Sequence, residues 1–202
     1  MALVTIQEAR LYVPQLTQDD STLGTLIDRA EGALAMWLRW PIPDGFGRPT
    51  LEQQTYTFFL NGPAYADFMR LDLPIRPIQS ITSIHDDPDR VYGADTLVAA
   101  SDYEVDKNKG EIFLLPQATH SWNHARRTIK VVCDCGLVES QDVEVAKQAI
   151  VMLVKHWWEL RHTQGLASAT QGGQSQARRS EALPVHVTQL VSHWRTWGAE
   201  VA

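Results

Sequence analysis

The stretch that decides the fold runs from Asp142 to His162 and reads DVEVAKQAIVMLVKHWWELRH. Its apolar residues recur at steps of three and four, the spacing of one stripe on an α-helix. They are Ala146, Ala149, Ile150, Leu153, Val154, Trp157 and Leu160. Ser140 or Asp142 can cap the start, and Gly165 ends the pattern. Burying such side chains gains roughly 1.5–3 kcal/mol each, so this helix can organise a small domain.

Two further helices are expected near the N-terminus. Thr5 and Glu8 have the spacing of a capping box, which predicts a short helix over Ile6–Val13. The polar cluster Asp19–Ser21 predicts the start of a second, longer helix. That helix has to stop before Pro41, because a residue preceding proline is pushed out of the helical region.

From about Gln53 to Cys135 the pattern changes from helical to alternating, and turn sequences separate short runs rich in β-branched and aromatic residues. The runs are QTYTFFL, IQSITSIH, DYEVD, EIFLL and RTIKVVCDC. In the last run Ile129, Val131, Cys133 and Cys135 share one face, as period-2 alternation requires. We expect a small, mostly antiparallel sheet or sandwich inserted between the second and third helices.

The chain after the main helix divides into two parts. Residues 164–182 are rich in Gly, Ser, Gln, Ala and Thr, which predicts a linker that is flexible in the free protein. Residues 183–202 then contain an apolar stripe at helical spacing, which predicts a short amphipathic helix. The stripe consists of Val187, Leu190, Val191, Trp194 and Trp197. We favour docking of this helix on a partner; the alternative is that it folds back on its own domain.

The sequence therefore predicts an α+β protein with a helical core and an inserted β region. The expected parts are residues 1–41 (N-terminal helices), 50–136 (β region), 140–163 (main core helix), 164–182 (linker) and 183–202 (C-terminal docking segment). A chain of 202 residues can form one good core, or a core with an appendage.

The composition excludes several classes of protein. A formal charge of −6 argues against a broad phosphate-binding surface. No signal peptide is visible, and the longest apolar run, Ala149–Val154, is far short of the ~20 residues that cross a bilayer. Cys133 and Cys135 lie two apart on an expected strand, a poor spacing for a disulfide, so we expect reduced thiols. The seven tryptophans suit either an interface or a core.

No common catalytic motif is present: the chain has no phosphate-binding loop, no dinucleotide fingerprint, no Gly-x-Ser-x-Gly and no His-Glu-x-x-His. His120 and His124 are spaced as a metal pair would be on a helix, but the surrounding sequence is typical of a loop. His85 with Asp86–Asp89 could bind a cation, yet Asp-Asp-Pro-Asp is common turn composition and lacks the glycine and distal glutamate of a calcium loop. We therefore expect no cofactor and no metal site.

The order of segments resembles the head-tail connector proteins of long-tailed phages and gene transfer agents, also called adaptors or head-completion proteins. The resemblance rests on VTIQEAR at the start, the acid-capped helix from Asp20, LPIRPIQSITSI, SDYEVDKNKGEIFLL, IKVVCDCG, VEVAKQAIVMLVKHWWELR and the closing LPVHVTQLVSHWR. These blocks cover most of the chain in the family's order. The chain departs from the family where the strand before the main helix has cysteines in place of an aromatic residue and continues through Gly136-Leu137 in place of Gly-Tyr.

The resemblance implies a structural protein of the virion neck and no enzymatic activity. Such proteins form a ring, usually of about twelve subunits, beneath the portal. The ring extends the DNA channel and joins the capsid to a stopper or tail. Assembly would take place in the host cytoplasm, without a membrane, and genomic DNA would pass through without sequence-specific binding.

The resemblance also suggests which residues make contacts. The residues expected to bind the portal are Leu183, Pro184, Val187, Leu190, Val191, Trp194 and Trp197. Candidates for contacts between subunits are Trp37, Trp157, Trp158 and Arg161. Two alternatives stay open: another neck protein, such as a stopper or tail-completion protein, or a small metal-binding enzyme that uses His85, His120 and His124.

Overall fold

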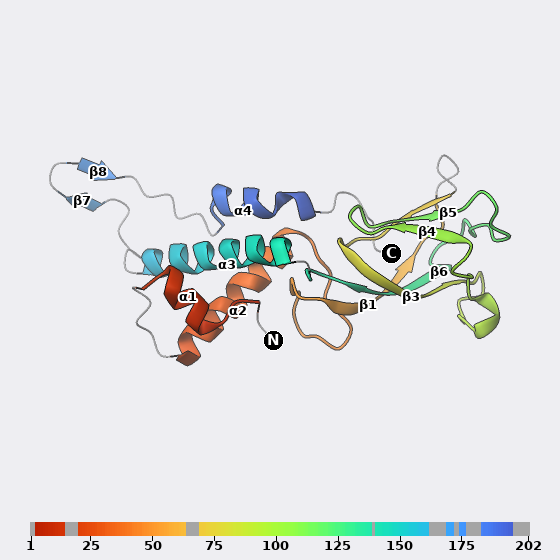
Figure 1. Cartoon of the computed structure of the whole chain (residues 1–202), viewed down its shortest axis with the longest axis horizontal. Coiled ribbons are helices and arrows are strands. Elements are labelled where there is room, and N and C mark those ends of the chain that lie inside the picture. The colour runs from red at the N-terminus through yellow and green to blue at the C-terminus, as the bar shows by residue number, and fades with distance from the viewer. Residues whose placement is uncertain are drawn as a thin grey trace.

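A helical layer and a β-sandwich lie end to end in the computed structural model (Figure 1). The structure describes residues 3–14, 20–63, 69–138, 140–161, 169–171, 174–176 and 183–195. The expected α+β class is confirmed, and six of the described strands are inserted between the second and third helices. Among these residues, no helix has both the length and the apolar character needed to span a bilayer.

The three predicted helices are present with slightly different ends. They are α1 (Ile6–Tyr12), α2 (Asp20–Trp37) and α3 (Ser140–Arg161). The capping box of α1 is confirmed, because the Thr5 hydroxyl accepts the Glu8 N–H and the Glu8 carboxylate accepts the Thr5 N–H at 2.8 Å.

The apolar stripe of α3 faces the core as predicted over most of its length. Ala146, Ala149, Ile150, Leu153 and Val154 are all fully buried. The stripe then shifts, since Trp157 and Leu160 are half-buried and Trp158 is the more buried of the two tryptophans. The fully buried part of the predicted stripe therefore ends at Val154.

The β region forms two three-stranded antiparallel sheets that pack face to face (Figure 1). One sheet has the order β1-β6-β3, with β1 (Gln54–Leu60), β6 (Ile129–Cys135) and β3 (Ile78–Asp86). The other has the order β2-β5-β4, with β2 (Arg70–Asp72), β5 (Glu111–Leu114) and β4 (Tyr103–Asp106). A short 3-10 helix, η2 (Ala94–Thr96), lies between β3 and β4.

The sandwich encloses the alternating residues that the sequence assigned to one face. On β6, Ile129, Val131, Cys133 and Cys135 are all fully buried. Strand β2 was not predicted, because three residues with one buried leucine are too short to show a period.

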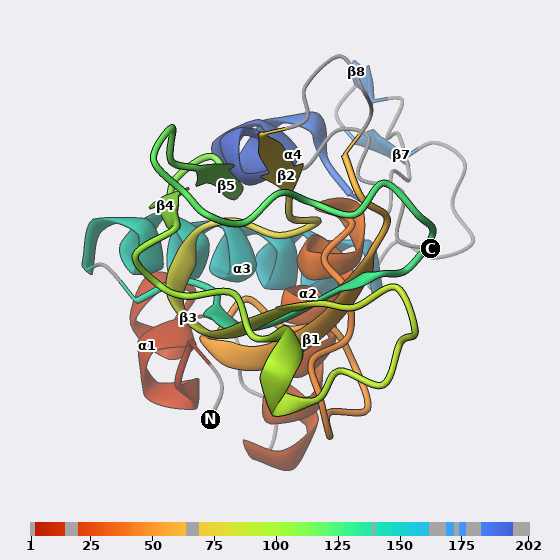
Figure 2. The same cartoon turned by 90° about the vertical axis from the view of Figure 1, so that its right-hand side faces the viewer.

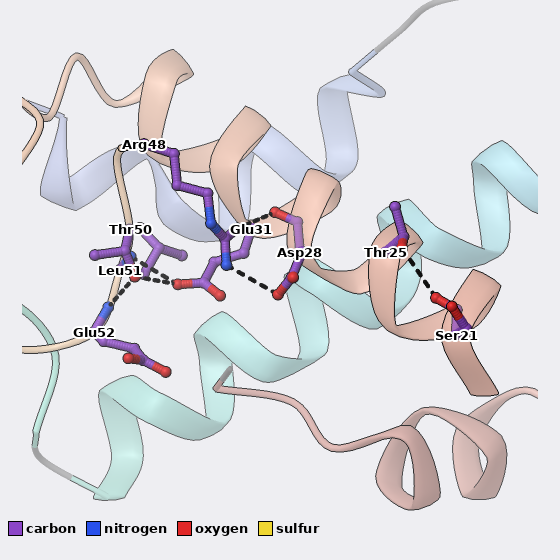
Figure 3. A network of polar contacts seen from close by, with 8 residues as sticks. All are labelled: Ser21, Thr25, Asp28, Glu31, Arg48, Thr50, Leu51 and Glu52. Carbon is purple, nitrogen blue, oxygen red and sulfur yellow. Dashed lines mark hydrogen bonds and ion pairs between the residues drawn. The ribbon is translucent and has the colours of Figure 1, made fainter. Parts of the chain in front are cut away.

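A buried carboxylate connects the helical layer to the segment that enters the sandwich (Figure 3). Glu31 of α2 is 1% exposed, and its Oε1 accepts hydrogen bonds from the Thr50 hydroxyl at 2.5 Å and the Leu51 N–H at 3.1 Å. One turn earlier on α2, Asp28 accepts two hydrogen bonds from the Arg48 guanidinium, one at its backbone oxygen and one at its carboxylate. The approach to β1 is therefore held on α2 by charge-assisted hydrogen bonds.

The C-terminal part contains more structure than predicted. Two short strands, β7 (Ala169–Gln171) and β8 (Gln174–Gln176), pair within the expected linker, and the rest of residues 164–182 lies outside the described residues. The expected terminal helix is α4 (Val185–Val191), followed by the 3-10 helix η3 (Ser192–Trp194). In Figures 1 and 2, α4 lies on the side of α3 opposite α1.

Candidate assembly surfaces

The histidines and acids that could have formed a catalytic or metal site are used as structural contacts. The Asp86 side chain is fully buried, and its Oδ2 lies 2.9 Å from Nε2 of His120 and 2.8 Å from the backbone nitrogen of Asn123. His124 instead contacts the backbone oxygen of Pro63 at 2.8 Å. His120 and His124 therefore have separate partners, and in the described ranges no three His, Cys, Asp or Glu side chains gather as metal ligands.

The Asp-Asp-Pro-Asp sequence forms a turn, as expected. The Asp87 carboxylate accepts backbone N–H groups from Asp89, Val91 and Tyr92 at 2.7–2.8 Å. These hydrogen bonds, with that of Tyr92 the strongest, lower the pKa of Asp87. The carboxylate is thus occupied by backbone donors.

The two cysteines are buried free thiols whose sulfur atoms lie 3.3 Å apart. The hydrogen bond with Cys133 and the burial of the group raise the pKa of the Cys135 thiol. A buried, protonated thiol is a poor nucleophile, so this pair acts as part of the sandwich core.

Two of the predicted subunit-interface residues lie together. Trp157 and Trp158 line a groove of about 380 Å³ between α3 and α2, and the α2 side of this groove includes Thr22 and Thr25. Trp37 lies at the other end of α2, half-buried beneath the Arg195 guanidinium, which is 4.6 Å from the ring centroid. Arg161 is the last residue of α3.

A larger groove, of about 670 Å³, lies between α1 and α3 and was not predicted. Val13, Val151 and Met152 contribute apolar side chains to it, and Tyr12 stands at its edge with 68% of its surface exposed. Little in the sequence indicates this groove, because an apolar pair such as Leu11-Tyr12 is typical of the end of a short helix. One rim carries an ion pair of 2.7 Å between Glu8 and Lys147.

This ion pair shifts the pKa of Glu8 strongly. The Lys147 ammonium is the largest cause, followed by the Thr5 N–H and hydroxyl, and together they lower the pKa to about 2. Glu8 therefore joins α1 to α3 and caps α1 at the same time.

The C-terminal segment folds back on its own domain, which is the alternative to the favoured docking on a partner. Val187, Val191 and Trp194 are buried in the core shared with α3. Pro184 is also buried, Leu183 and Leu190 are half-buried, and Trp197 lies outside the described residues. The Trp40 indole N–H donates to the Trp194 carbonyl at 3.4 Å, and the Arg76 guanidinium donates to the carbonyl of Arg195.

Comparison with protein-family models gives one decisive match. The model described as "Head completion protein" matches residues 2–197. The chain belongs to the head completion protein family. This membership identifies a structural protein of virion assembly. A comparison with curated proteins found no match.

Solved structures with a similar fold come from gene transfer agent (GTA) particles. A chain from the "Neck of empty GTA particle computed with C6 symmetry" is 19% identical, with a TM-score of 0.59, and the match covers 97% of this chain and 91% of that chain. A chain from the "Neck of native GTA particle computed with C12 symmetry" is 19% identical, with a TM-score of 0.56 and coverages of 96% and 88%. The similarity therefore extends over the helices, the sandwich and the C-terminal segment.

Proposed function

We propose that this protein is a head-tail adaptor of a phage or gene transfer agent particle. It forms a ring of twelve subunits beneath the portal, extends the DNA channel, and provides the surface on which a stopper or tail protein assembles. The observation that carries this proposal is the match of the head completion family to residues 2–197. The neck structures computed with C6 and C12 symmetry, which match over nearly the whole chain, support the ring.

The helical layer favours an adaptor over a stopper, the other neck protein considered. A stopper is expected to be mostly β, whereas this chain has α2 and α3 as its longest elements. The groove that contains Trp157 and Trp158 lies on this layer and is proposed as part of the contact between subunits, together with Trp37 and Arg161. Aromatic side chains and arginine are enriched in such contacts.

The C-terminal segment 183–197 is proposed to bind the portal. Its exposed residues Val185, His186 and Gln189 can contact the portal while the segment stays on α3. Val187, Val191 and Trp194 reach a partner only if the segment leaves α3, because they are buried in the isolated subunit. The residues between α3 and α4 provide the length for such a movement. Twelve weak contacts of this kind make a lasting joint, since each later one is intramolecular.

The test is electron microscopy and mass measurement of the purified protein mixed with the portal of the same particle. A ring that caps the portal is expected with the full-length chain. A chain ending at Thr163 should lose the ring if the C-terminal segment is the portal contact. A portal that stays uncapped by the full-length chain overturns the adaptor function.

Two point variants separate portal contact from stability of the subunit. Val185→Asp changes a residue that is 59% exposed, so it should weaken portal binding with little effect on unfolding. Val191→Asp places a carboxylate in the core and should destabilise the subunit by several kcal/mol. Unchanged portal binding by Val185→Asp would remove the exposed side of α4 from the portal contact.

A further inference from the structure

The outer face of the β1-β6-β3 sheet ends in a group of basic and aromatic side chains. This basic cluster consists of the contacting residues Phe59, Tyr92, Arg127 and Lys130, together with Arg90 and Arg126, which are their exposed neighbours along the chain. Phe59 and Lys130 are cross-strand partners and point away from the sandwich core. The Arg127 guanidinium lies 5.3 Å from the centroid of the Phe59 ring, and the Lys130 ammonium lies 5.7 Å from that of Tyr92.

The backbone holds the basic cluster in a defined shape. Arg90, Tyr92 and Arg127 have positive φ angles of 61°, 55° and 56°, which non-glycine residues seldom adopt. The Tyr92 hydroxyl donates to the Arg127 carbonyl at 2.6 Å, and the Asn61 side chain accepts the Arg127 N–H at 3.0 Å. Unfavourable backbone conformations of this kind persist where surrounding contacts fix them, and they gather at binding surfaces.

Few carboxylates are available to balance these cations. Asp86 is occupied by His120 and Asn123, and Asp87 by backbone N–H groups. At the other end of β6, Asp134 accepts the hydroxyls of Thr55 and Ser80. Asp89 and Asp95 are exposed carboxylates close to the cluster. The cluster is therefore a positively charged region on a chain whose formal charge is −6.

The outer face of the other sheet is acidic. Leu71 and Ile112 point into the core, so the residues on either side of them point outward. The outward residues form two cross-strand rows, Asp72-Glu111-Asp106 and Arg70-Phe113-Glu104, which we call the acidic face. Its four carboxylates outnumber the cations that pair with them, which are Arg70 and the adjoining Lys109. Glu104 is exposed, and among the described residues no ion pair joins it.

The basic cluster and the acidic face lie on opposite sides of the sandwich, because they belong to the outer faces of its two sheets (Figure 1). A ring needs two different, complementary surfaces on opposite sides of each subunit, so that contacts repeat head to tail. We propose that the basic cluster of one subunit binds the acidic face of the next subunit in the ring. This inference rests on the proposed ring function and assigns a specific contact to it.

The strength of such a contact is consistent with controlled assembly. Opposite charges attract more strongly across an interface than in water, because the local dielectric constant is lower there. Several pairs orient the subunits and speed their association, and salt weakens them. The same charges repel a subunit that presents the wrong face, so they also select the head-to-tail arrangement.

The test is a charge exchange, read as ring formation on the portal by electron microscopy and mass measurement. The variant Arg127→Glu with Lys130→Glu should raise the subunit concentration needed for ring formation at least ~10-fold, since like charges then face each other. Adding Glu104→Lys and Glu111→Lys to the same chain restores opposite charges across every contact. This four-site variant should form rings within ~3-fold of the wild-type concentration.

A matched control has the same net charge but places the lysines elsewhere. Arg127→Glu and Lys130→Glu combined with Glu144→Lys and Glu159→Lys, at exposed positions on α3, should stay unable to form the ring. Circular dichroism checks that each chain is folded.

Normal rings from the first variant, or failure of the folded four-site variant to recover, would overturn the proposed contact. Loss of duplex DNA binding in the first variant without recovery of rings would assign the cluster to DNA. If the wild-type chain forms no ring on the portal, it is the adaptor function that fails.

Discussion

At the scale of single residues, Glu31 has the most consequential environment. Burial, the largest cause, raises the pKa of Glu31 above its ordinary 4.5, and the hydrogen bonds from Thr50 and Leu51 partly oppose it. The folded chain thus holds this proton to higher pH than the unfolded chain does. The contribution of Glu31 to stability is greatest below pH 4.5 and falls as the pH rises through the folded pKa.

Replacing Glu31 by glutamine should therefore flatten the pH dependence of stability above pH 4.5. Glutamine keeps the oxygen that accepts from Thr50 and Leu51, so the free energy of unfolding should stay within about 1 kcal/mol of wild type. Glu31→Ala leaves the buried Leu51 N–H without its acceptor and should lose about 1–3 kcal/mol. Urea unfolding at several pH values measures both effects.

Glu104→Gln, at an exposed position, is the control. If it changed the pH dependence of the free energy of unfolding as much as Glu31→Gln does, the assignment of that dependence to Glu31 would be contradicted.

At the scale of elements, the sequence predicted what short-range patterns determine. The capping box, the spacing on α3 and the alternation on β6 each depend on residues within one element, and the structure confirms them, the α3 stripe as far as Val154. Strand β2 was missed because three residues are too short to show a period, and the α1/α3 groove was missed because it depends on residues far apart in the chain. The position of the C-terminal segment was open for the same reason: the spacing of Val187 and Val191 predicts an apolar face without saying what covers it.

The contact between α1 and α3 gives a prediction at this scale. Glu8→Gln removes the ion pair with Lys147 and weakens the capping box, so it should destabilise the subunit at neutral pH by about 1–2 kcal/mol. The lowered pKa of Glu8, about 2, means that its stabilising effect is present above pH 4.5 and is lost as the pH falls toward 2. The difference from wild type should shrink accordingly in unfolding measured from pH 7 to pH 3.

Glu144 provides the matched control for Glu8. It also pairs with Lys147, at 3.3 Å, but its side chain is 62% exposed and lies on the same helix as the lysine. Glu144→Gln should change the free energy of unfolding by less than about 0.5 kcal/mol. If the two substitutions change the free energy of unfolding equally, the loss comes from leaving Lys147 with one partner fewer, and the contact between α1 and α3 adds nothing.

At the scale of the whole molecule, the distribution of charge links assembly to the passage of DNA. The chain has a formal charge of −6, and the basic cluster is a group of adjacent cations on the sandwich. In the proposed ring the acidic face of the next subunit covers this cluster. A protein that presents few free cations releases few counterions from DNA and gains little affinity for it.

The assembled ring should therefore bind duplex DNA more weakly than the free subunit does. At about 50 mM salt the free subunit should bind a labelled duplex weakly through Arg127 and Lys130, and Arg127→Glu with Lys130→Glu should abolish this binding. Rings on the portal should show no measurable affinity at about 150 mM salt, because the cluster is then covered. Fluorescence anisotropy of the duplex measures both states. Micromolar affinity of the assembled ring at the higher salt would mean that the cations face the channel, where they would slow the DNA.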